Sequence, residues 1–191
     1  STCEMVTEML QYISDKNILS PIEAEALFAG IYLDTKYFTF KTGVRTLEAA
    51  AYLRRSGIDP IAVKQYFKSD FKTYTKRAEL VQSAEIIKEH ISIVVSTERC
   101  SPSLIAQAAD ELLNISDIDA SFVICRGNEG SIISGRSTGD INVQLILEAF
   151  GGGGHFSVAG AQVKDTEPDE LKIRLIETIE NYMSENTQKG K

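Results

Sequence analysis

Four consecutive glycines, Gly151, Gly152, Gly153 and Gly154, stand directly before His155, and they restrict what this chain can build more than any other stretch. Glycine lets the backbone adopt positive φ and approach another group closely, but it costs about 0.5–1 kcal/mol per residue relative to alanine in regular structure. A run of glycines at that cost indicates that something comes close to the backbone there.

Two interpretations of the glycine run are open. The apolar residues before it fall at helical spacing, so a helix end followed by a flexible linker would explain one glycine. That interpretation leaves the other glycines, His155 and a second small-residue turn at 159–161 without a role. We therefore predict a ligand-facing loop that offers backbone N–H groups and an imidazole to an anion such as a phosphate.

The hydrophobic pattern divides the chain into a helical part and a mixed part. Helical spacing predicts helices over 3–14, 22–33, 47–56 and 61–88. Ser20 and Thr46 are the predicted caps of the second and third of these helices. Short β-branched runs predict strands over 91–96, 120–126, 131–137 and 161–163, the middle two forming a hairpin. Further helices are expected over 103–114, 141–150 and from 171 onward.

The predicted fold class is therefore α/β. Residues 1–70 are expected to form a helical domain and residues 71–90 a connector helix. Residues 91–187 are expected to form a second domain, with a mixed β-sheet flanked by helices.

The composition excludes several classes of function. The net charge of −7 argues against a surface that holds long nucleic acid, which requires basic patches, although a short phosphorylated ligand fits a local pocket. The three cysteines lie far apart and lack metal-ligand spacing, which favours a reducing, cytoplasmic compartment. No apolar stretch approaches the roughly 18 residues of a membrane span, and no signal peptide is expected.

Asp34 is a candidate metal ligand. It follows a nearly uncharged helix, at the end where the helix dipole disfavours an anion. A solvated aspartate that begins a turn is one explanation. The other is a carboxylate ligand for a hard divalent cation, which prefers oxygen donors.

Arg136 and Ser137 form a candidate anion site at the end of a predicted strand, about fifteen positions before the glycines. A guanidinium donates bidentate hydrogen bonds in a fixed plane, which suits phosphate. An exposed arginine without a ligand is the alternative.

These motifs resemble the DHH–DHHA1 phosphoesterases, and within them the cyclic-di-AMP phosphodiesterases of the membrane-anchored GdpP type. In the second half the resemblance rests on Gly135-Arg136-Ser137, on residues 140–143, on the glycine run with His155, and on Ala159-Gly160. In the first half it rests on residues 1–8, 30–38 and 42–46.

The resemblance implies roles for the candidate residues. Asp34 corresponds to the last aspartate ligand of a two-manganese centre. Arg136, Ser137, the glycine run and His155 correspond to the residues that hold the phosphate and base of a dinucleotide. The intact protein is then expected to hydrolyse cyclic-di-AMP to linear pApA, with this part as a cytoplasmic domain of a protein anchored in the cell membrane.

The chain departs from the family pattern because it contains no Asp-His-His triplet and no His-x-x-x-Asp-x-Asp stretch. Those motifs are expected upstream, in a missing N-terminal part of the same protein, and the chain also begins without methionine. One aspartate does not fix two metal ions, so we predict that the isolated chain is inactive.

Two other functions stay open on the sequence. One is a phosphodiesterase for linear dinucleotides or short oligonucleotides, and the other is a non-catalytic nucleotide-binding module. Base preference and the formation of a homodimer are also left open.

Overall fold

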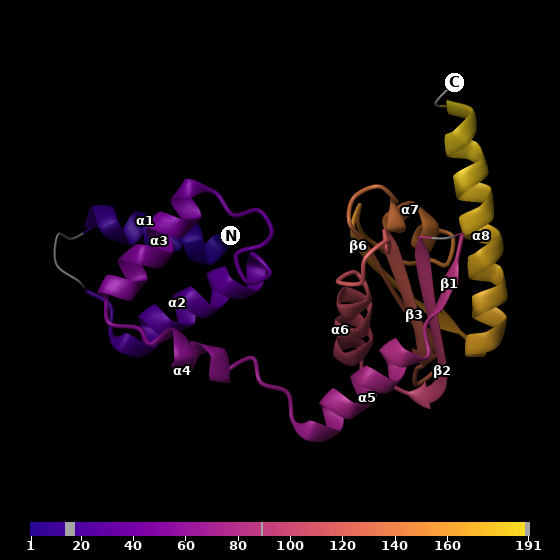
Figure 1. Ribbon diagram of the computed structural model, residues 1–191, viewed down its shortest axis with the longest axis horizontal. Coiled ribbons are helices and arrows are strands. Elements are labelled where there is room, and N and C mark those ends of the chain that lie inside the picture. The colour runs from indigo at the N-terminus through magenta and orange to yellow at the C-terminus, as the bar shows by residue number, and fades with distance from the viewer. Residues whose placement is uncertain (14–17, 89, 190–191) are drawn as a thin grey trace. The chain divides into compact units, whose positions relative to one another are not determined.

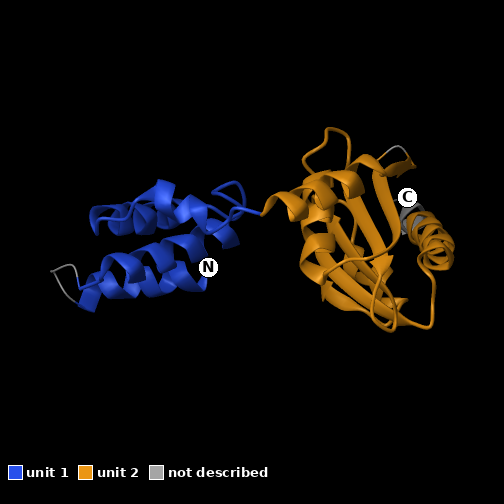
Figure 2. Cartoon of the chain, turned by 90° about the horizontal axis from the view of Figure 1, so that it is seen from below, with its two compact units in different colours: residues 1–69 blue, residues 70–191 orange. Residues whose placement is uncertain are grey.

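The computed structural model describes residues 1–13, 18–88 and 90–189, and it divides the chain into two compact units (Figure 2). Unit 1 comprises Ser1–Ser69 and unit 2 comprises Asp70–Lys191. The predicted α/β fold with a mixed sheet flanked by helices is confirmed, and the sheet lies in unit 2.

Unit 1 is built from helices: α1 (Thr2–Ile13), α2 (Pro21–Asp34), α3 (Val44–Arg55) and α4 (Pro60–Gln65). The predicted helix 3–14 is confirmed as α1, while residue 14 lies outside the described residues. The helices bury a small apolar core of Ala24, Ile31, Ala49, Leu53 and Ile58. Apolar faces at helical spacing therefore account for this unit.

The helix starts of unit 1 show one confirmed cap and one wrong cap. Ser20 caps α2 as predicted, and its backbone N–H donates to the Glu23 carboxylate at 2.8 Å. Thr46 was predicted to cap a helix at 47–56, but α3 begins at Val44 and its N-cap is Gly43. The Thr46 hydroxyl instead accepts the Gly43 N–H from inside the first turn, at 3.2 Å. Thr46 thus bonds back to the N-cap residue from the third position of the helix and does not cap the N–H groups that follow it.

The predicted single helix over 61–88 is wrong. The chain forms α4, then α5 (Phe71–Gln82), then the strand β1 (Glu85–Ile87). Asp70 starts α5 because its carboxylate accepts the Thr73 N–H at 3.0 Å, the bond that defines an N-cap. The charged residues on both sides of Asp70 conceal this break in the sequence.

Unit 2 holds a six-stranded sheet in the order β1-β2-β3-β4-β6-β5. Its other strands are β2 (Ile91–Arg99), β3 (Ala120–Arg126), β4 (Gly130–Ser137), β5 (Gly153–His155) and β6 (Val158–Lys164). β2 and β3 run parallel, and the other neighbours pair antiparallel. The parallel pair is joined by helix α6 (Pro102–Leu112), and β3 and β4 form the predicted hairpin.

Helices cover the two faces of the sheet unequally. On one face α7 (Val143–Glu148) and α8 (Pro168–Lys189) pack over a large core that includes Phe122, Ile133 and Leu175. On the other face α5 and α6 pack over a smaller core that includes Val94 and Val123. Figure 1 shows α6 and α8 on opposite sides of the sheet.

None of the helices in the described ranges is long and apolar enough to cross a membrane.

Candidate functional site

Strand pairing gathers the candidate residues on one face of the sheet. Residues that pair directly across neighbouring strands point to the same face. Ser134 of β4 pairs with Gly160 of β6, which pairs with Gly153 of β5. One step along the strands, Arg136 pairs with Val158, which pairs with His155. We call these six residues the glycine platform.

The glycine platform lies beside helix α6, which covers only part of that face. α6 is fixed over β3 by the Ser121 hydroxyl, which donates to the Ala109 carbonyl oxygen at 2.7 Å. Gly153, His155, Val158 and Gly160 are exposed, so β6 and β5 present this side to solvent. The platform borders a groove of about 380 Å³ whose lining includes Ser134, Gly153, Gly160 and Gln162.

The fold itself accounts for three of the four glycines in the run. Gly151 lies in the turn after α7 with φ of +70°, a left-handed conformation that glycine adopts readily. A Cβ on Gly152 would lie 2.4 Å from the Gly160 carbonyl oxygen, and one on Gly154 would lie 2.3 Å from that of Val158. The predicted loop is therefore wrong for its second half, because residues 153–155 form the edge strand β5.

Gly153 is the glycine in the run that the fold does not require. Nothing lies within 4 Å of a Cβ built on it, and its φ is not positive. Within 4 Å, a Cβ built on its partner Gly160 would meet only the Ile133 carbonyl oxygen, at 3.3 Å. Glycine inside a strand weakens it and often marks a place where another group approaches the backbone. Gly153 and Gly160 together expose a bare backbone patch on the open face.

The local structure around Gly160 also differs from the prediction. The small-residue stretch 159–161 was expected to form a turn, but it lies inside β6. Ala159 and Ala161 point to the covered face, where both are buried in the large core. Small side chains are thus needed for packing on one face, and an open backbone is left on the other.

Arg136 is buried at 9% exposure and is held by neighbours on the same face. Its Nη1 donates to the Ser134 hydroxyl at 2.8 Å and to the Gly135 carbonyl oxygen at 3.0 Å. Its Nε lies 3.3 Å from a carboxylate oxygen of Asp110 on α6. The guanidinium is therefore oriented before any ligand binds, and Asp110 partly neutralises its charge.

Ser137 does not join the glycine platform. It follows Arg136 on β4, so its side chain points to the opposite face. Its hydroxyl accepts the backbone N–H groups of Gly139 at 3.0 Å and Ile141 at 3.3 Å. The structure thus gives Ser137 the role of holding the turn after β4.

His155 is exposed at the sheet edge, next to a well-anchored loop. The Ser157 carbonyl oxygen accepts the Ser137 N–H, and the Phe156 carbonyl oxygen accepts the Val143 N–H, both at 3.0 Å. These bonds fix the turn between β5 and β6 against β4 and α7. The imidazole is therefore presented from a fixed backbone, on the same face as Arg136.

Sequence reasoning missed Ser134 and Gln162 as neighbours of the glycine run. Both lie on the platform side of their strands, and both line the groove. Period-two alternation from Arg136 would have found Ser134. The pairing of β6 with β4, which places Gln162 opposite Ile132, has no signal in a single sequence.

Asp34 lies in unit 1 as the last residue of α2, and it is exposed. The backbone directly after it is strained, because Lys36, Tyr37 and Phe38 have φ of 44°, 64° and 62°. The buried Thr35 hydroxyl stabilises this turn by donating to the Ile31 carbonyl oxygen at 2.8 Å and accepting the Phe38 N–H at 3.0 Å. Strain of this kind persists where a particular local geometry is needed.

The residues present do not fit a complete metal centre. Within the ranges that the structure describes, no three His, Cys, Asp or Glu side chains come together in a way that could hold a metal ion. Asp34 therefore supplies a single carboxylate, which does not by itself fix the two ions implied by the resemblance.

Cys100 is a half-buried free thiol directly before Ser101, the N-cap of α6. A hydrogen bond with the Cys125 thiol, aided by the charge of Lys76, lowers the pKa of Cys100 to about 7. The same hydrogen bond and burial raise the pKa of Cys125. Cys100 thus carries substantial thiolate near neutral pH.

The fold and the platform together define an α/β domain with a mixed sheet whose open edge presents bare backbone, an oriented arginine and a histidine. Comparison with known families matches residues 90–185 to the DHHA1 domain. The chain belongs to the DHHA1 domain family.

Similar proteins extend the likeness to nearly the whole chain. The cyclic-di-AMP phosphodiesterase GdpP of Geobacillus thermodenitrificans is 45% identical over 185 residues, which are 95% of this chain and 28% of that protein. The cyclic-di-AMP phosphodiesterase PdeA of Listeria monocytogenes is 44% identical over 190 residues, 98% of this chain and 29% of that protein. The chain thus spans less than a third of the length of these relatives.

A solved structure supports the fold. An exopolyphosphatase-related protein from Bacteroides fragilis matches with a TM-score of 0.84 and 20% identity. The match covers 95% of this chain and 56% of that one.

We predict opposite outcomes for alanine at two neighbouring glycines. Gly152→Ala forces a Cβ against backbone at 2.4 Å and should lower the free energy of unfolding of unit 2 by about 2–3 kcal/mol. The Cβ added by Gly153→Ala meets nothing within 4 Å, so this variant should change the free energy of unfolding by less than about 1 kcal/mol. Urea denaturation followed by circular dichroism measures both, and equal losses would contradict the assignment.

We also predict that Cys100 alkylation follows a titration near pH 7. In a Cys3→Ser background, the rate of reaction with iodoacetamide should rise with pH through about 7, because the thiolate is the nucleophile. Cys125→Ala removes the main hydrogen bond and should move the midpoint to higher pH. Lys76→Ala should move it in the same direction by less. A midpoint that Cys125→Ala does not move would show that the thiol pair has no such effect.

Proposed function

We propose that this chain is the dinucleotide-binding part of a phosphodiesterase that hydrolyses cyclic-di-AMP to linear pApA. The observation that carries the proposal is Gly153, a glycine without a structural reason, set opposite Gly160 on the open face. The names of the two relatives supply the substrate class.

In this proposal the glycine platform holds one phosphate and its nucleoside. The bare backbone at Gly153 and Gly160 lets the ligand lie directly on the sheet. Arg136, oriented by Ser134 and Asp110, supplies cationic donors from one side. His155 supplies an imidazole from the other end of the row in which Arg136 pairs with Val158 and Val158 with His155. Ligand binding and orientation are thus separated from the chemical step.

We propose that the chemical step needs the remainder of the enzyme. Asp34 would be one ligand of a manganese pair, which would supply the hydroxide for attack on the phosphodiester, and the other ligands would come from outside these 191 residues. The strained backbone that follows Asp34 supports this role. We further propose that the parent protein is membrane-anchored, with this part in the cytoplasm.

Nucleotide binding to the isolated chain tests the platform. Gly153→Val fills the bare patch and should weaken binding of adenosine monophosphate at least tenfold, as measured by isothermal titration calorimetry. His155→Ala should weaken it by about three- to tenfold, because it removes one polar contact. Gly43→Val is the matched control, since it adds the same side chain in unit 1 where nothing lies within 4 Å.

Folding of each variant is checked by circular dichroism before affinity is compared. Equal affinity of Gly153→Val and the wild-type chain would remove the platform as the binding surface. An equal loss in Gly43→Val would show that the effect is not local.

A further inference from the structure

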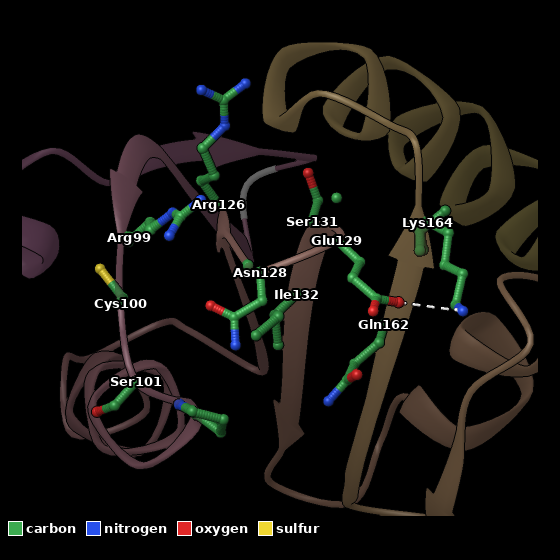
Figure 3. A pocket seen from close by; sticks show the side chains of 14 residues that line it. Arg99, Cys100, Ser101, Arg126, Asn128, Glu129, Ser131, Ile132, Gln162 and Lys164 are labelled. Atoms are coloured by element: carbon green, nitrogen blue, oxygen red, sulfur yellow. Dashed lines mark ion pairs between the residues drawn. The ribbon is translucent and has the colours of Figure 1, made fainter.

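A second groove lies at the hairpin between β3 and β4 (Figure 3). It has a volume of about 480 Å³ and lies between residues 99–102, the hairpin residues 126–132 and residues 162–164. It shares Pro102, Ile132 and Gln162 with the groove beside the platform. The two grooves therefore form one continuous path along β4 and β6.

Two arginines, Arg99 and Arg126, line the far end of this second groove, and Arg126 points to the face that α8 covers because it pairs with Ser131, which pairs with Val163. The register of β2 against β3 shifts between Ser96 and Arg99, and the shift pairs Arg99 with Arg126. Adjacent guanidinium groups repel each other unless anions lie near them. Arg126 forms an ion pair with Glu167. Arg99 is exposed and makes no ion pair with any residue in the described ranges, so its charge is available to a ligand.

The other polar groups of the second groove leave a positive balance. Lys164 forms an ion pair with Glu129 at 3.1 Å, which Figure 3 shows on the β6 side. Among the residues that line the groove, Glu129 and the Cys100 thiolate are anionic, against the cationic Arg99, Arg126 and Lys164. The local charge thus favours an anion, although the chain as a whole carries −7.

Asn128 and Gln162 add neutral hydrogen-bonding groups to the same groove. Both side chains are exposed, and both line the groove that Figure 3 shows. A carboxamide offers both donors and an acceptor, which matches the mixed pattern on the edge of a nucleobase. The groove therefore combines groups for a phosphate with groups for a base.

The length of the path indicates how much ligand it takes. Gly160 and Lys164 are four residues apart on β6, which is about 13 Å at the rise of a strand. A ligand that lies on the platform and also reaches the arginines must be extended. A linear dinucleotide with a terminal phosphate has this form, whereas a cyclic dinucleotide is closed on itself.

We propose that the second groove binds the distal nucleotide of a linear, 5′-phosphorylated dinucleotide, with its terminal phosphate at Arg99. The inference rests on the proposed function, since the first nucleotide lies on the glycine platform. The chain then holds a linear dinucleotide more tightly than a mononucleotide, and Arg99 is the residue that distinguishes them.

Calorimetry with four ligands tests the groove: pApA, the same dinucleotide without its 5′-phosphate, adenosine monophosphate and cyclic-di-AMP. The wild-type chain should bind pApA most tightly. Arg99→Ala should weaken pApA about tenfold, which is about 1.4 kcal/mol, and should leave the other three within about twofold. Arg55→Ala, which removes an exposed arginine of unit 1, is the matched control and should change none of them.

Alkylation of Cys100 gives an independent local readout, because Cys100 lines the second groove. In the Cys3→Ser background, saturating pApA should slow the reaction with iodoacetamide, and saturating adenosine monophosphate should not. If Arg99→Ala leaves pApA unchanged, or weakens the mononucleotide equally, the groove proposal is overturned. If the wild-type chain binds the mononucleotide but holds pApA no more tightly, only the groove proposal fails. If it does not bind the mononucleotide, the platform proposal fails.

Discussion

The candidate site depends on how far helix α6 extends over the sheet. The bond from Ser121 to the Ala109 carbonyl oxygen and the pair between Arg136 and Asp110 fix α6 over β3 and the near side of β4. Beyond that line the same face of β6 and β5 is open, while α7 and α8 bury the opposite face. The strands β4, β6 and β5 pair antiparallel, an arrangement that tolerates one solvent-facing side, and we propose that this open half of the face receives the ligand. Strand alternation then decides which side chains reach that surface, and it separates Arg136 from Ser137 although they are neighbours in sequence.

Much of the fold could be predicted from the sequence, because its signals are local. Serine caps before proline mark the starts of α2 and α6, and β-branched runs mark the central strands. The failures arise where two local signals compete. Asp70 breaks a charged stretch that otherwise continues as helix, and Thr46 satisfies the N–H of Gly43 from inside the turn it was expected to precede. The stretch 159–161 has the composition of a turn, but Ala159 and Ala161 are small because they pack in the core beneath β6.

The candidate site was less predictable than the fold, because it is assembled by strand register. The glycine run and Arg136 are visible in the sequence, but their alignment through β6 is not. The sequence also gives no means of distinguishing Gly152, which backbone contacts require, from Gly153, which they do not. The sequence likewise gives no sign of the second groove, where a shift in register pairs Arg99 with Arg126. Neighbouring glycines thus occur for different reasons, and the structure is needed to tell which of them the backbone contacts require.

The most direct test of this account is a map of backbone amide shifts by ¹H–¹⁵N correlation spectroscopy as adenosine monophosphate is added to the chain. The account predicts that the largest shifts fall on Ser134, Gly153, His155 and Gly160, with the buried Leu171 and Leu175 of α8 unchanged. Shifts concentrated in α8 or in unit 1, with the glycine platform unmoved, would contradict the claim that the open half of the sheet is the nucleotide-binding surface.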